Sequence, residues 1–183
     1  MNFVPYRGCK KSDITQYYSE AHKAIDLCPN VKDDPYGKWL VAPANIKINF
    51  IDEGAVLDES ENGLNRGYGL YMQSMEEPDL YWVYWHTLPV FPVSIGEYVN
   101  GGEEVAQMGN SGACFAGGVP VPDSEKLKLP FKGTHLHLER FRLVNGKIVY
   151  EDPLPYIDFN KQPSGDFIKE MWIVIKKIMG LLK

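Results

Sequence analysis

The sequence has no long apolar run and no excess of positive charge. Within its 183 residues, 19 basic side chains are outnumbered by 24 acidic ones. The resulting formal charge of −5 argues against a nucleic-acid partner, which binds a strongly basic face. No stretch of about 18 or more apolar residues occurs, which argues against a membrane-spanning helix. Residues 1–11 contain no apolar run of signal-peptide length, so we expect no ordinary secretion signal there.

Cysteine is scarce, and the sequence has no Cys-x-x-Cys pair. The three cysteines, Cys9, Cys28 and Cys114, are odd in number and widely spaced. This pattern is unlike a zinc site made of thiolates and unlike a disulfide framework. One disulfide with one free thiol and three unpaired thiols both fit the count, and we expect three unpaired thiols.

The remaining composition is typical of a folded protein rich in strands. Hydrophobic residues make up 44% of the chain and charged residues 23%, which is the balance of a globular protein rather than a disordered one. The length suits one domain with room for an appendage. The 13 prolines and 17 glycines imply many turns.

Hydrophobic periodicity predicts a series of short strands. Alternation over 46–51 favours a half-buried strand, and the aromatic run 81–85 favours another because rings pack well on a pleated surface. Asn145-Gly146 favours a tight turn between strands at 134–144 and 147–150. Further strands are expected at 38–42, 69–74, 80–86 and 98–108, with an acidic hairpin loop at 52–66.

The last residues show a different periodicity. Residues 164–183 carry apolar side chains at steps of three and four and several lysines, which predicts an amphipathic helix. Such a helix packs on its own domain, forms a seam for self-association, or lies on a membrane surface. The sequence therefore divides into a domain at 1–158 and a linker with a C-terminal helix at 159–183.

Four histidines make up the most informative pattern. His135 and His137 lie two apart in a predicted strand, so their side chains project from one face about 7 Å apart. His22 and Asp26 are four apart and share one side of either a helix or a strand. A catalytic zinc site typically uses three nitrogen or oxygen ligands and keeps its fourth position open. The combination predicts a metal site, although each spacing alone is common.

These residues stand in four ordered motifs. They are His22-Lys-Ala-Ile-Asp26, Tyr84-Trp-His86, Gly133-Thr-His135-Leu-His137-Leu-Glu139 and Asp152-Pro-Leu-Pro-Tyr156. A rhythm of glycine and valine between residues 96 and 112 separates the second motif from the third. In this order the chain resembles the LytM/lysostaphin-type zinc metallopeptidases, hydrolases that cut peptide cross-links in bacterial peptidoglycan. The resemblance spans roughly residues 5 to 157, and Ala24 stands where that family has glycine.

The resemblance implies a fold and a division of roles. The fold would be mainly β: a twisted antiparallel sheet forming an open groove, the duplicated hybrid motif, with an added C-terminal α-helix. His22, Asp26 and His137 would hold Zn²⁺, His135 would act as general base and His86 would stabilise the oxyanion. The implied activity is that of a zinc endopeptidase acting on peptidoglycan peptides. Glu139 would orient a ligand or be a surface charge, and we expect a surface charge.

The chain also departs from the family pattern. Residues 113–132 form a long insertion, which we expect to be a loop beside the site that shapes substrate access. Since no signal peptide is predicted, we expect a wall-acting protein that accumulates in the cytoplasm before release or travels in a virion, as a phage-encoded endolysin would.

Two other functions share features of this sequence. A wall-binding or virion structural module could keep the fold without turnover. A cupin-type barrel is disfavoured, because no further histidine follows His137.

Overall fold

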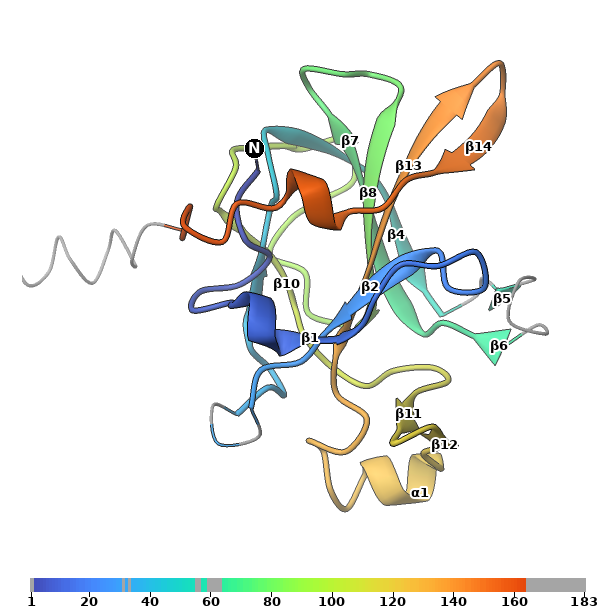
Figure 1. Ribbon diagram of the computed structural model, residues 1–183. Helices are drawn as coiled ribbons and strands as arrows, with labels where there is room; N and C mark the ends of the chain where they lie inside the picture. The colour runs from blue at the N-terminus through green and yellow to red at the C-terminus, as the bar shows by residue number, and fades with distance from the viewer. Residues whose placement is uncertain (1, 31, 33, 55–56, 59–63, 164–183) are drawn as a thin grey trace, which may run out of the picture.

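A computed structural model describes residues 2–163 except residues 31, 33, 55–56 and 59–63. Its centre is an antiparallel sheet in the order β1-β2-β13-β8-β7-β4-β9, with β14 paired to β13 (Figure 1). The strands of this sheet are β1 (Ile14–Gln16), β2 (Ala24–Leu27), β4 (Ile46–Glu53), β7 (Tyr68–Ser74), β8 (Leu80–Thr87), β9 (Tyr98–Val99), β13 (Leu136–Val144) and β14 (Lys147–Tyr150). The mainly β, antiparallel architecture expected from the sequence is confirmed.

Smaller elements surround this sheet. They are η1 (Lys11–Asp13), β3 (Trp39–Val41) paired with β10 (Glu104–Gln107), β5 (Leu57–Asp58) paired with β6 (Leu64–Asn65), β11 (Phe115–Ala116) paired with β12 (Val119–Pro120), α1 (Asp123–Lys126) and η4 (Leu154–Tyr156). The insertion at 113–132 is therefore more than the loop expected from its glycines and prolines. It contains the β11–β12 hairpin and the short helix α1, and Figure 1 shows it at the end of the sheet where β13 begins.

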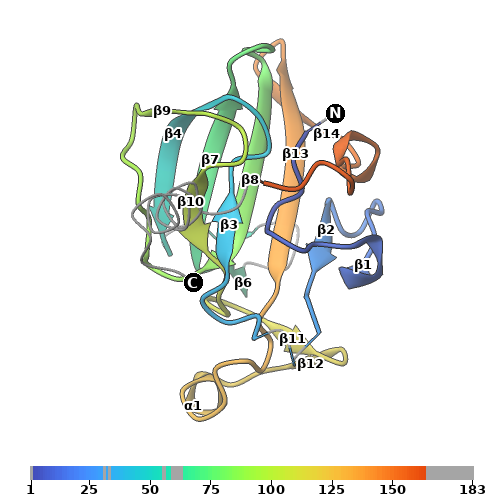
Figure 2. The ribbon, with the colours of Figure 1, turned by 90° about the vertical axis from the view of Figure 1, so that its left-hand side faces the viewer.

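One face of the sheet carries the main core. Alternate residues of the central strands, such as Ile48, Met72, Trp82 and Leu138, are fully or almost fully buried. Leu40 of β3 joins this cluster together with residues of β10, and Figure 2 shows these two strands in front of the sheet. The hydrophobic effect thus fixes the register, because a slip of one residue would move every core side chain to the other face.

The opposite face carries a smaller cluster and the polar residues of interest. Val83, Trp85 and Phe141 are buried together there. Since side chains alternate along a strand, His137 and Glu139 share this face of β13 with Phe141. The pattern that buries Leu138 in the main core therefore directs these two polar side chains to the second face.

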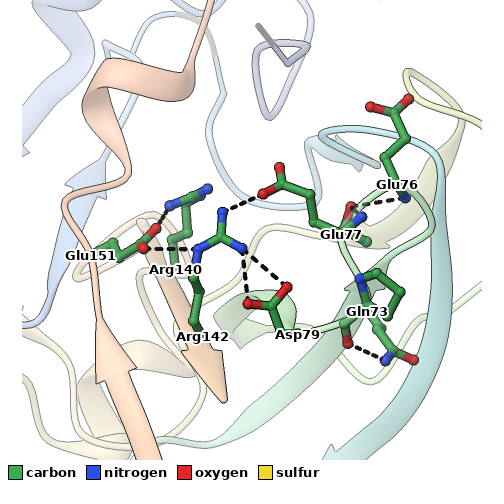
Figure 3. Close-up of polar contacts among 9 residues, drawn as sticks. Gln73, Glu76, Glu77, Asp79, Arg140, Arg142 and Glu151 are labelled. Atoms are coloured by element: carbon green, nitrogen blue, oxygen red, sulfur yellow. Dashed lines mark hydrogen bonds and ion pairs between the residues drawn. The ribbon is translucent and has the colours of Figure 1, made fainter. Parts of the chain in front are cut away.

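A network of ion pairs joins the two long hairpins at their outer ends. The Arg142 guanidinium lies 3.1 Å from both carboxylate oxygens of Asp79 and 3.0 Å from Glu151, and it also pairs with Glu77 (Figure 3). Arg140 is buried, pairs with Glu151 and stacks on the Tyr156 ring at 3.5 Å. A planar guanidinium suits such multiple pairing, so the network links the β7–β8 turn to β13 and β14.

Several expectations concern the ends of the chain. The predicted C-terminal helix at 164–183 lies outside the described residues. Phe159 packs against the main core, and the Gln162 side chain bonds to Gly8 and Cys9, so residues 159–162 contact the domain, while the division at residue 158 stays a prediction. Within the described part of the chain, no helix is long and apolar enough to cross a membrane.

The expectation of three unpaired thiols is confirmed. Cys9, Cys28 and Cys114 are all free, and Cys9 and Cys114 are buried.

Two loops cross at closely apposed glycines. Gly67 and Gly112 both have positive φ, and a Cβ added at Gly112 would lie 2.2 Å from the Gly67 nitrogen. The Ala113 N–H donates to the Asn65 carbonyl oxygen at 2.6 Å across this crossing. Only residues without a side chain allow the two backbones to approach so closely.

Gly112→Ala is therefore expected to destabilise the protein more than Gly146→Ala, which changes a residue of similar φ with no neighbour within 4 Å of its added Cβ. The left-handed backbone alone costs about 1–2 kcal/mol for a residue with a Cβ. The steric conflict at residue 112 adds about 1–3 kcal/mol. Urea unfolding of both variants measures the difference, and equal losses in the free energy of unfolding would contradict this account.

Candidate metal centre

Three of the predicted site residues are brought together by strand pairing. Asp26 of β2 lies directly opposite His137 of β13, and His22 precedes β2 in a bridge with Ser19. The Asp26 Oδ1 atom is 3.0 Å from His137 Nδ1 and 3.3 Å from His22 Nε2. All three side chains are buried, and their ligand atoms lie within 4.8 Å of one another.

The atoms of this group are arranged as metal ligands rather than as hydrogen-bond partners of one another. Asp26 Oδ1 is buried and makes no hydrogen bond of acceptable geometry, although the two imidazole nitrogens are close. Zinc held at bond lengths of about 2.0–2.1 Å in tetrahedral geometry places its ligand atoms about 3.3 Å apart. The two separations from Asp26 Oδ1, 3.0 Å and 3.3 Å, are close to that value, and the donors are two imidazoles and one carboxylate.

Three of the histidines are oriented by backbone carbonyl oxygens. Their Nδ1 atoms face Tyr17 O at 3.4 Å from His22, Ser111 O at 2.9 Å from His86 and Gly133 O at 2.9 Å from His135. A carbonyl oxygen only accepts, so Nδ1 carries the proton in each case. In the neutral imidazole Nε2 is then unprotonated and free to bind a metal or accept a proton.

In His137 it is Nδ1, not Nε2, that is directed at the candidate metal site. Its Nδ1 faces Asp26, and its Nε2 lies 3.4 Å from Glu139 Oε1. Glu139 is 2% exposed and pairs with the buried Arg66, whose guanidinium lies 5.5 Å from the Trp85 ring centroid. The expectation that Glu139 is a surface charge is wrong: its side chain is buried next to the His137 ring, on the side away from Asp26.

His86 has an unusual backbone at the end of β8. Its φ is 60°, a left-handed conformation that non-glycine residues seldom adopt. The ring lies 4.6 Å from the His135 centroid and 5.7 Å from that of His137. Strained backbone of this kind is often found at functional sites, where the surrounding structure holds it in place.

His135 belongs to a second set of three residues that could hold a metal ion. His86, His135 and His137 also have ligand atoms within 4.8 Å of one another, and His135 Nε2 lies 3.8 Å from Asp26 Oδ2. All five predicted site residues therefore surround one small volume, with His137 common to both groups.

Burial keeps two of these imidazoles neutral. It lowers the pKa of His86 to well below the usual value, and the nearby His135 and His137 lower it further. Burial also lowers the pKa of His137 to about 4, against the opposing effect of Asp26. For Asp26, burial alone would raise the carboxyl pKa, but contacts with His137 and His22 outweigh it and hold that pKa below its usual range. Neutral imidazoles and an ionised carboxylate are the forms that bind metals.

Sequence reasoning missed Arg66 and Ser111. Arg66 is 73 residues before Glu139, and no local pattern relates the two. Ser111 acts through its backbone carbonyl on His86, a role that any residue type could fill. Only the crossing at Gly67 and Gly112 brings both residues to the site.

A cavity of about 900 Å³ opens at this group. It is lined by all four histidines, by Asp26 and by residues of the insertion. The volume lies in the range of small-molecule and peptide sites.

Neither a protein-family model nor a curated protein sequence matches the chain. Among solved structures, LytU is 23% identical over 88% of this chain and 91% of its own, with a TM-score of 0.55. The catalytic domain of lysostaphin from Staphylococcus simulans is 18% identical over 79% and 87%, with a TM-score of 0.50.

This chain has the LytM/lysostaphin-type fold. A third similar structure, Csd3 from Helicobacter pylori, has a TM-score of 0.52 and 16% identity, and covers 98% of this chain but 42% of its own. At such identities the comparison with the LytM/lysostaphin-type peptidases establishes the fold. The chemistry must be argued from the side chains.

The imidazole orientations can be measured in the metal-free protein. We expect ¹⁵N NMR at neutral pH to show Nδ1–H tautomers for His86 and His135, because each donates to a carbonyl oxygen. The His86 signals should not shift through pH 6.5, where an ordinary histidine is half-protonated, since burial lowers its pKa. Single His→Gln variants assign the four sets of signals. A titration of His86 near pH 6.5 would contradict the structure.

Proposed function

We propose that this protein is a zinc-dependent endopeptidase that hydrolyses peptide cross-links or stem peptides of bacterial peptidoglycan. The observation that carries the proposal is the convergence of two imidazoles and one carboxylate, with two further imidazoles beside them, in one cavity of a LytM/lysostaphin-type fold. Lysostaphin is described as an antimicrobial peptidase, which supports the reaction class.

His22, Asp26 and His137 would hold the metal. This set includes the carboxylate whose buried oxygen makes no hydrogen bond, whereas the group His86, His135 and His137 would leave that charge without a partner. Bound zinc lowers the pKa of a water ligand to about 7 and polarises a carbonyl group. Glu139 and Arg66 would keep Nδ1 of His137 directed at the metal.

His135 would be the general base. Its Nδ1–H is held by the Gly133 carbonyl oxygen, which leaves Nε2 of this cavity-lining residue unprotonated and able to take a proton from the attacking water.

His86 would contact the substrate carbonyl oxygen. Because its Nδ1–H already binds Ser111, it can donate from Nε2 only as the imidazolium. Negative charge developing on the carbonyl oxygen favours that form, in opposition to the burial that lowers the pKa of His86.

Loss of a ligand and loss of a base should have different signatures. His22→Ala is expected to lose both zinc and wall hydrolysis, whereas His135→Ala should retain about one zinc per chain and lose turnover by about 10²–10⁴-fold. Zinc is measured by elemental analysis, and hydrolysis by new amino termini released from purified peptidoglycan.

Hydrolysis by a zinc-free His22→Ala variant would refute the proposal. Tight wall binding by the wild type without any new amino termini would instead indicate a wall-binding module.

Glu139→Gln tests the support of His137. We expect zinc affinity to fall about 10–100-fold, as is usual when the partner of a ligating histidine is changed. Glu151→Gln is the matched control, because it removes the carboxylate of another arginine pair on the same sheet, that of Arg140. Competition with a chelator measures both affinities. Equal zinc affinities of the two variants would show that Glu139 does not contribute to metal binding.

A further inference from the structure

The insertion at 113–132 is rigidly attached at its base. The ammonium group of the buried Lys126 bonds to the Gly112 carbonyl oxygen and lies 3.0 Å from Asp123. The Asn110 side-chain amide donates to the Pro130 carbonyl oxygen at 2.8 Å and to that of Lys132 at 3.2 Å. These hydrogen bonds attach the insertion to the segment at residues 110–112.

Two aromatic rings of this rigid insertion remain exposed. Phe115 is 42% exposed and Phe131 is 44% exposed, and both line the cavity of the candidate metal centre. Large apolar side chains left open inside a pocket indicate a ligand-binding surface. The rings come from the two ends of the insertion, and both present apolar surface to the cavity that holds the candidate metal ligands.

The charge of the cavity restricts what these two rings can bind. Among the cavity-lining residues that the structure describes, Asp26 is the single carboxylate, and the lysine is Lys132, whose ammonium lies 2.5 Å from Glu125. An acidic substrate side chain against the two rings would lose its hydration beside apolar atoms, and the lysine of the lining is already paired with Glu125. An aliphatic side chain would instead remove apolar surface from water.

We propose that Phe115 and Phe131 form an apolar subsite for an uncharged aliphatic side chain next to the scissile bond. The substrate class is then a peptide with a methyl-bearing residue such as alanine at that position, in preference to glycine or an acidic residue. This proposal rests on the proposed peptidase function and adds a determinant of specificity that the insertion supplies.

Preference for the methyl group is expected to be modest and measurable. Burial of one such group corresponds to about a three- to fourfold change in kcat/KM. A carboxylate without a partner is penalised more heavily, so the acidic peptide should be the poorest of the three.

The test uses three glycan-free peptides that differ only in alanine, glycine or glutamate beside the scissile bond. Phe115→Ala and Phe131→Ala should each reduce the alanine-to-glycine ratio of kcat/KM from about fourfold towards one. Leu127→Ala is the control, because Leu127 is 84% exposed in the same insertion and does not line this cavity. An unchanged ratio in both phenylalanine variants would overturn the proposal.

A second measurement separates the subsite from catalysis. Titration of the metal-free protein with the alanine and glycine peptides, followed by NMR, should shift the ring signals of Phe115 and Phe131 more with alanine. Such binding without any cleavage by the zinc-loaded wild type would support the subsite and refute the peptidase function. Cleavage with unaltered ring signals would support the peptidase function and refute the subsite. Phenylalanine variants impaired only on glycan-bearing substrates would assign the rings to a sugar and overturn the proposal.

Discussion

The antiparallel pairing of β13 with β2 and β8 is the constraint on which the site depends. It places Asp26 directly opposite His137, and alternation along β13 puts Glu139 on the same face. The main core sets this register, because Leu136 and Leu138 must face the other way to be buried. A hydrophobic requirement on one side of the sheet therefore determines the spacing of polar atoms on the other.

The loop crossing at Gly67 and Gly112 contributes to both sides of the candidate metal centre. On one side it brings Arg66 to Glu139, which lies behind His137. On the other side it brings the carbonyl oxygen of Ser111 to His86. One structural feature thus supports both the proposed ligand His137 and the proposed oxyanion contact His86. The support of His137 consists of the buried pair Arg66 and Glu139, and removal of either residue leaves the other without that polar partner.

The net charge of −5 bears on how the protein would bind its substrate. If the proposed function holds, an acidic protein gains no long-range attraction towards an anionic cell wall, and its affinity for that substrate would come from short-range contacts. The exposed rings of Phe115 and Phe131, held on an anchored insertion, offer such contacts beside the metal centre. A rigid apolar wall loses little conformational entropy on binding, which favours recognition by shape.

Much of the fold was already determined by sequence. Alternating apolar residues and the Asn145-Gly146 turn predicted the strands that became β4, β8, β13 and β14, because side-chain periodicity and turn chemistry act locally. The five expected site residues stand in short motifs, and the structure brings all five together. Their roles remain proposals.

The tertiary structure alone decided the rest. Glu139 became a buried partner of Arg66 because a distant loop covers it, and His86 turned towards His135 because the chain adopts a positive φ. The insertion became a hairpin and a short helix through anchors such as that of Lys126. These features depend on contacts between residues far apart in the chain, which no local pattern records, whereas strands and turns follow from neighbouring residues.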